Sequence, residues 1–240
     1  MKLRHLLETA RLGDSAALFA LGVLHDRGVA DVPKDLNLAT DYYKRAADLN
    51  LPIAKYVLAL RYSIGKEVEQ DHARAFQLCK EAAEIGLPVA QYTLAIYYAT
   101  GSGVEVNKSE ARAWLGKAAR SGVANAQREM ACAYFDVDTF VCTNAEEAIK
   151  WLTKAADAGD GLAAGYLFQI YDIGKGISRD VGKALEWLGK AAVLGEPSAH
   201  IKLAQFYRQG IYGFPISNEK ADEHLKLMHD AVTRMEDDCN

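Results

Sequence analysis

The side chains of this sequence that could do catalytic or metal chemistry do not fall into a recognisable catalytic or metal-binding pattern. Its six histidines include no His-Glu-x-x-His sequence, and its four cysteines include no Cys-x-x-Cys pair, so the ligand spacing of a zinc site is lacking. No Gly-x-Ser-x-Gly sequence is present to form a nucleophilic serine turn. We therefore expect no catalytic residues, no metal site and no cofactor.

One segment is superficially similar to a phosphate-binding loop. It runs from Gly176 to Lys183, but five residues rather than four separate its glycines, and Ala184 stands where a Ser or Thr would hold magnesium. We interpret the segment as a turn between helices and expect the protein not to be an enzyme. A hydrolase-like enzyme with an unrecognised site, such as a Cys-His pair, remains the alternative of another class.

Charge and hydropathy exclude two classes of partner. The 240 residues include 28 basic and 32 acidic side chains, a net charge of −4, without a dense basic cluster. Nucleic acid is therefore not expected as a partner, because phosphate binding needs a concentrated basic surface. The longest apolar stretch, Ala16 to Leu24, is too short to cross a bilayer, so direct membrane insertion is not expected either.

The expected location is the cytoplasm. Residues 1–13 are amphipathic and unlike a secretory signal, and the cysteines do not recur at a regular spacing, which favours reduced thiols over a disulfide framework. The alternative is an exported or periplasmic protein whose signal was removed before residue 1.

The elements that position all these side chains are helices of an internal repeat. Each copy carries an Ala, a Leu (Met in the fourth copy) four residues later, and a Tyr or His eight residues after the Ala. This i, i+4, i+8 spacing lies on one face of a helix, and a period of 36 or 37 residues is typical of a stacked solenoid. The copies begin at Ala17, Ala54, Ala90, Ala126, Ala163 and Ala199.

A second helix completes each copy. It is preceded by a residue that caps helix N-termini, such as Asp71 or Asn107, and carries an Ala-x-x-Trp-type stripe, as in Ala111 and Trp114. The tryptophans recur at one repeat position, so we interpret them as packing residues rather than as a ligand cage.

The sequence predicts one domain over residues 1–240 with about a dozen helices. It comprises a half-repeat at 1–13 and repeats at about 14–51, 52–87, 88–123, 124–160, 161–196 and 197–240, the last with a C-terminal capping helix.

The repeat resembles the Sel1-like family, relatives of tetratricopeptide repeats. The third copy is close to the full motif in Ala90, Leu94, Tyr98, Gly101, Gly103, Val104, Asn107, Ala111, Trp114, Lys117, Ala118 and Ala119. The resemblance implies an all-α, right-handed superhelix and a role as an adaptor or scaffold, as in bacterial members of the family. The fourth copy departs from the motif, since the segment Asp136 to Thr143 replaces the glycine turn and its role stays open.

The candidate binding site is the concave face, which the first helix of each repeat lines in the related tetratricopeptide fold. Positions two and six residues after the opening Ala should face inward and form an apolar strip in the first three repeats, suited to a peptide or a partner helix. A packing role between helices is the alternative interpretation of the aromatic residues. The candidate partner-binding residues are Phe19, Val23, Tyr56, Leu60, Tyr92 and Ile96, with Arg128 as a possible charged anchor.

These observations predict an adaptor or scaffold that binds a protein or peptide. A bacterial immunity-type inhibitor that neutralises a toxin is the alternative within binding proteins, on the basis of size and acidic charge. A purely structural spacer is the third possibility, and the oligomeric state stays open.

Overall fold

The computed structural model describes residues 2–29, 31–134, 143–174 and 176–239, and these ranges form thirteen α-helices and one short 3-10 helix. The expected all-α fold is confirmed. None of the described helices is long and apolar enough to span a membrane. Contacts divide the chain into two compact units, Met1–Ser121 and Gly122–Asn240, and we describe each by itself. The single domain over residues 1–240 stays a prediction.

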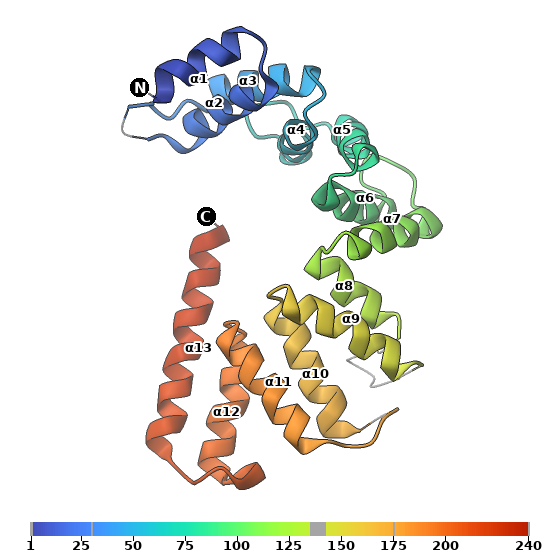
Figure 1. Cartoon of the computed structure of the whole chain (residues 1–240), viewed down its shortest axis with the longest axis vertical. Coiled ribbons are helices and arrows are strands. Elements are labelled where there is room, and N and C mark those ends of the chain that lie inside the picture. The colour runs from blue at the N-terminus through green and yellow to red at the C-terminus, as the bar shows by residue number, and fades with distance from the viewer. Residues whose placement is uncertain (1, 30, 135–142, 175, 240) are drawn as a thin grey trace. The chain divides into compact units, whose positions relative to one another are not determined.

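The first unit is a stack of seven helices in which each helix packs against the next along the chain (Figure 1). After α1, which is the expected half-repeat, the helices pair as α2 with α3, α4 with α5, and α6 with α7. Their bounds are α1 Lys2–Arg11, α2 Ser15–Arg27, α3 Leu36–Asp48, α4 Pro52–Ile64, α5 His72–Ile85, α6 Pro88–Thr100 and α7 Lys108–Arg120.

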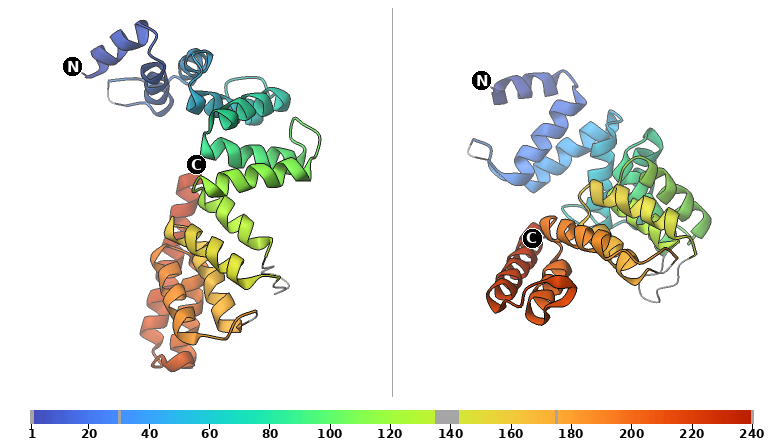
Figure 2. Two further views of the ribbon diagram at one scale, coloured as in Figure 1. Left: turned by 45° about the vertical axis from the view of Figure 1, so that its right-hand side comes forward. Right: turned by 60° about the horizontal axis from the view of Figure 1, so that its bottom comes forward.

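The second unit continues the pairing with α8 and α9, α10 and α11, and α12 and α13. The two views of Figure 2 show the long helix α13 lying along α12. The bounds of the helices in the second unit are α8 Ala124–Cys132, α9 Ala145–Asp157, α10 Gly161–Ile173, α11 Val181–Val193, α12 Pro197–Gln209, the 3-10 helix η1 Ile211–Gly213 and α13 Asn218–Cys239. Of the divergent segment Asp136 to Thr143, residues 136–142 lie outside the described residues. The Thr143 backbone N–H donates to the Tyr134 carbonyl at 2.9 Å.

Helix ends follow from a few residue types. The Asp71 carboxylate accepts a bond from the Arg74 backbone N–H at 2.9 Å and caps α5, and six further helices preceded by Asp or Asn are capped in the same way. Pro52 and Pro88 occupy the first positions of α4 and α6, where the missing N–H breaks no hydrogen bond. Gly101 ends α6 in the left-handed conformation with φ 80°.

Alanine and leucine of the repeat form the core of each unit. Ala90 and Leu94 are fully buried in the first unit, as are Ala163 and Leu167 in the second. Small alanines allow the helix axes to approach closely, and leucines fill the space between pairs. The tryptophans pack against these cores as expected, but Trp151 and Trp187 are half-buried with Lys154 and Lys190 above their rings. The lysines are at 4.8 Å in both cases, which supports packing and not a ligand cage.

Candidate partner-binding face

The predicted binding residues fall on helices of both units. Phe19 and Val23 lie on α2, Tyr56 and Leu60 on α4, and Tyr92 and Ile96 on α6, all in the first unit. Arg128 lies on α8 in the second unit. Leu60 and Ile96 are 39% and 38% exposed, whereas Phe19, Val23, Tyr56 and Tyr92 are half-buried. The structure therefore leaves part of every one of these side chains accessible.

Helices α4 and α6 together form an apolar surface. The hydroxyl of Tyr56 and the hydroxyl of Thr93 are 3.3 Å apart, so side chains of the two helices meet at this point. Ile64, 67% exposed, continues the α4 stripe one turn beyond Leu60, and Val89, 40% exposed, precedes the α6 stripe. We call this surface the α4–α6 apolar face, and its residues are Tyr56, Leu60, Ile64, Val89, Tyr92 and Ile96.

Ile64 and Val89 were not among the residues predicted from the sequence, because only two positions in each repeat were expected to face inward. Their signal was present, since a residue four positions after Leu60 and one three positions before Tyr92 lie on the same side of their helices. Following the helical period for one more turn in each direction would have found both.

The charged side chains of α4 point away from this face. Helix α6 contains no charged residue, and α4 contains only Lys55 and Arg61. Lys55 is 8% exposed and its ammonium lies 2.6 Å from the Glu81 carboxylate. Arg61 is 4% exposed and its guanidinium lies 2.7 Å from Asp26. Consequently α4 and α6, both of which lie wholly within the described residues, expose apolar side chains and no unpaired charge.

Phe19 and Val23 contribute less to this surface. Both pack against the core that α1, α2, α3 and α4 share, and the Phe19 ring lies 5.4 Å from the buried ring of Tyr43. Phe19 and Val23 therefore serve mainly in packing between helices. Tyr56 also packs against the core that α4, α5, α6 and α7 share, so only the accessible part of its half-buried ring belongs to the α4–α6 apolar face. The accessible apolar surface of the first unit therefore centres on α4 and α6.

Arg128 already has an acidic partner in the chain. Its Nε donates to the Asp160 carboxylate at 2.8 Å, and the two side chains are 21% and 8% exposed. A second guanidinium nitrogen donates to the Asn125 side chain at 3.3 Å. The Arg128 guanidinium is thus bound to Asn125 of α8 and to Asp160, the residue that caps α10. To bind a partner protein, it would have to contact that partner while keeping its ion pair with Asp160.

Two features bear on metal and thiol chemistry among the described residues. These residues contain no group of three or more His, Cys, Asp and Glu side chains that could hold a metal ion. Cys79 is fully buried, and burial raises the pKa of its thiol to about 12, so a reactive thiolate does not form at neutral pH.

The fold defines the class of the protein as an α-helical repeat protein of stacked helix pairs. A profile of the Sel1 repeat matches residues 15–51, 52–87, 88–123, 124–160, 162–196 and 197–227, and the chain therefore belongs to the Sel1 repeat family. Proteins of this family generally mediate protein–protein interactions and typically act as scaffolds or adaptors without enzymatic activity.

Solved structures support the same family. A Sel1 repeat protein from Oxalobacter formigenes is 28% identical with a TM-score of 0.83, and the match covers 96% of this chain and 98% of the other. A protective antigen of uropathogenic Escherichia coli with an SLR fold is 33% identical with a TM-score of 0.81. That match covers 95% of this chain but 48% of the antigen, so the chain spans about half of the antigen's length.

An immunity protein from Pseudomonas aeruginosa has a similar fold at lower identity. It is 20% identical with a TM-score of 0.56, over 92% of this chain and 81% of the other. Among curated proteins, none matches the chain in sequence.

Proposed function

We propose that this protein is an adaptor that binds an apolar segment of a partner protein on the α4–α6 apolar face. The observation that carries the proposal is the pairing of exposed apolar side chains with the lack of any unpaired charge on α4 and α6. Exposed apolar side chains of this kind gain free energy when a partner removes them from water.

The spacing of the exposed residues suits a helical partner. Tyr56, Leu60 and Ile64 follow one another at four-residue intervals, and Val89, Tyr92 and Ile96 at three- and four-residue intervals. Two such stripes, on helices whose side chains meet at Tyr56 and Thr93, can be contacted by an amphipathic helix with residues at i, i+3, i+4 and i+7. Tyr56 and Tyr92 supply large, stiff rings, the residue type that most often contributes binding energy at interfaces.

The experiment places a charge on the face without disturbing the core. Leu60→Asp and Ile96→Asp change side chains that are more than one third exposed, so the fold should tolerate both. Proteins captured by the wild-type chain are identified by mass spectrometry, and their affinity is then measured with each purified variant. Affinity should fall by at least about tenfold, because a carboxylate would be desolvated in an apolar interface.

Val193→Asp is the matched control. Val193 is 87% exposed on α11 in the second unit, outside the α4–α6 apolar face, and the substitution adds the same charge. The control should bind as the wild type does. A partner that binds Leu60→Asp and Ile96→Asp as tightly as Val193→Asp would refute the proposed face.

A toxin-neutralising inhibitor is the second candidate function. It is motivated by the fold shared with immunity proteins of P. aeruginosa, a likeness that concerns the fold alone. If it holds, expressing this chain should restore growth to cells that produce a toxin encoded beside its gene, and Leu60→Asp should abolish the rescue. Growth inhibition that persists with the wild-type chain would exclude this role for that toxin.

A further inference from the structure

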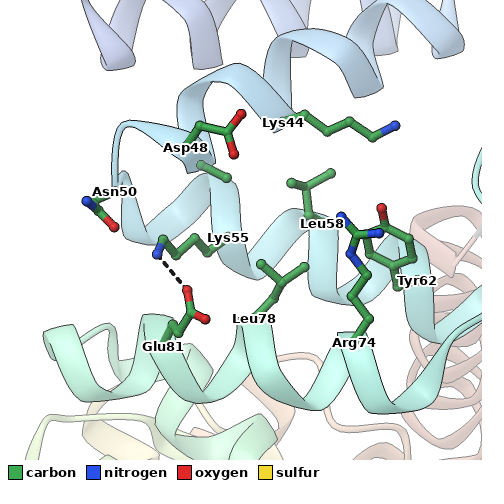
Figure 3. Close-up of a pocket in the computed structure, with 10 residues that line it drawn as sticks. Lys44, Asp48, Asn50, Lys55, Leu58, Tyr62, Arg74, Leu78 and Glu81 are labelled. Atoms are coloured by element: carbon green, nitrogen blue, oxygen red, sulfur yellow. Dashed lines mark hydrogen bonds and ion pairs between the residues drawn. The ribbon is translucent and has the colours of Figure 1, made fainter.

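A pocket of about 290 Å³ lies on another side of α4, between α3 and α5 (Figure 3). Its floor contains Leu58 of α4 and Leu78 of α5. Lys55, Leu58 and Tyr62 line it from α4 at three- and four-residue spacing, whereas Leu60 and Ile64 belong to the α4–α6 apolar face. This α3–α5 pocket is therefore a separate site, and its lining is polar at both ends.

One end of the pocket collects hydrogen-bond donors. Lys44 of α3, Tyr62 of α4 and Arg74 of α5 lie toward this end in Figure 3. The Arg74 guanidinium is held 4.5 Å above the Tyr62 ring. Among the described residues, no carboxylate pairs with Lys44 or Arg74, and the Tyr62 hydroxyl has no hydrogen-bond partner. Two cations and a hydroxyl thus border this end of the pocket, and none of the three is paired with an acceptor in the described part of the chain.

The other end has the opposite character. Asp48, Asn50 and the Lys55–Glu81 pair lie there (Figure 3). Glu81 neutralises Lys55 across 2.6 Å, and this hydrogen bond lowers the pKa of the Glu81 carboxyl. Asp48 has no cationic partner within the described ranges. The pocket therefore offers a net positive end, an apolar middle and a net negative end.

The fifth repeat has a pocket at the matching tyrosine, and the cations that line it are paired with carboxylates. Lys183 lies 5.3 Å above the Tyr171 ring, at the same repeat positions as Arg74 and Tyr62. However, Lys183 lies 3.6 Å from Asp180, and the neighbouring Arg179 lies 2.9 Å from Asp172. The cation over this tyrosine thus has a carboxylate partner in the fifth repeat and lacks one among the described residues in the second.

We propose that the α3–α5 pocket binds a short zwitterionic peptide, with its carboxylate at Lys44, Tyr62 and Arg74 and its ammonium at Asp48. A carboxylate accepts from all three donors, and guanidinium–carboxylate contacts are among the strongest hydrogen bonds in proteins. Lys55 lies at the same end of the pocket as Asp48, and Tyr62 lies at the other end. The two residues are about two helical turns apart along α4, roughly 10 Å, which is the span of about three extended residues. An apolar central side chain would rest on Leu58 and Leu78.

The experiment titrates the full-length chain with the tripeptide Ala-Leu-Ala and follows backbone amide resonances by NMR. The free tripeptide should give saturable shifts at residues of α3, α4 and α5 around the pocket. Amidating its C-terminus should weaken binding by about tenfold, or about 1.4 kcal/mol, because the amide carries no charge toward Lys44 and Arg74. Acetylating its N-terminus should also weaken binding, since the acetylated end carries no charge toward Asp48.

Variants of the protein separate binding from folding. Arg74→Gln and Lys44→Gln change exposed side chains. Each substitution should lower the affinity for the tripeptide by about tenfold, while the thermal melting curve should stay that of the wild type. Lys183→Gln is the matched control, because it removes the equivalent cation from the fifth repeat and should leave binding unchanged. The proposal is overturned if no saturable shifts occur, if Arg74→Gln and Lys44→Gln bind as the wild type does, or if either blocked peptide binds as well as the free one.

Discussion

Arg61 joins three repeat elements through a guanidinium that is almost completely buried. It donates to Asp26 of α2 at 2.7 Å, to Thr40 of α3 at 2.7 Å and to Glu67 in the turn after α4 at 2.8 Å. Its guanidinium also lies 5.1 Å above the Tyr43 ring. Burial, with a smaller contribution from Asp26, raises the pKa of Tyr43 to about 12. The positive charge is thus fully used inside the first unit and is not available to a partner.

Replacing Arg61 with Ala should therefore destabilise the protein strongly. Asp26 and Glu67 would lose their cation, and removing one member of a buried ion pair costs about 3 kcal/mol or more. Urea denaturation measures the loss, and Arg4→Ala is the control. Arg4 pairs with Glu8 at 3.5 Å on the surface, with 89% of its side chain exposed, so its removal should leave the free energy of unfolding nearly unchanged. Equal stabilities of the two variants would show that the Arg61 network contributes nothing.

The pair His200 and His224 should make the second unit sensitive to acid. Their Nδ1 atoms are 3.2 Å apart between α12 and α13, and His224 stacks on Tyr207. Burial, assisted by the neighbouring His224, lowers the pKa of His200, and burial also lowers the pKa of His224 although Glu223 opposes it. The unfolded chain then binds protons first as the pH falls, so stability present above about pH 6.5 is lost below it.

Urea midpoints at neutral pH and at about pH 5.5 test this dependence. The wild type should lose stability on acidification, and His224→Gln should lose less, because it removes one titrating group and the repulsion between two protonated rings. His229→Gln changes an exposed histidine of the same helix and should behave as the wild type does. The same acid loss in all three proteins would attribute it to other groups.

At the scale of helices, the sequence predicted most of the fold and only part of the site. Proline, glycine and capping residues mark helix ends by their own backbone chemistry, so positions such as Pro88 and Gly101 could be read without a structure. The unpaired cations of the α3–α5 pocket could not, because pairing depends on side-chain directions across three helices. A buried role for Arg61 could have been suspected from the sequence, because it is one of only two charged residues in the otherwise largely apolar helix α4.

The turn between α6 and α7 packs closely against the preceding repeat. Gly103 has φ +71°, and a Cβ there would lie 2.0 Å from the His72 carbonyl oxygen at the start of α5. No side chain fits at that distance, so Gly103→Ala must shift the turn or the end of α5. We expect a loss of about 2 kcal/mol or more in the free energy of unfolding, as backbone strain and a steric clash add.

Gly122→Ala is the control for Gly103→Ala. Gly122 has φ +90°, but a Cβ there would meet no atom within 4 Å, so only the backbone strain applies. Thermal unfolding of both variants should show the larger decrease for Gly103→Ala. If Gly122→Ala were equally destabilised, the contact with His72 would be unimportant.

For the molecule as a whole, the two proposed sites rely on different forces although they share helix α4. The α4–α6 apolar face has exposed Leu60, Ile64 and Ile96 and no unpaired charge, so its binding energy comes from removing apolar surface from water. In the α3–α5 pocket, Lys44 and Arg74 provide the attraction, which is electrostatic. Dissolved salt screens the second force far more than the first.

Ionic strength should therefore distinguish the two sites in one protein. Raising the salt concentration from about 50 mM to about 500 mM shortens the screening length from roughly 14 Å to roughly 4 Å, which weakens contacts between exposed charges. The affinity for Ala-Leu-Ala should fall several-fold, while the affinity of a partner on the α4–α6 apolar face should change by less than about twofold. Isothermal titration calorimetry at the two salt concentrations measures both, and the partner should also show a negative heat-capacity change. A partner whose affinity falls with salt as steeply as that of the tripeptide would be binding through charges, and therefore not on the α4–α6 apolar face.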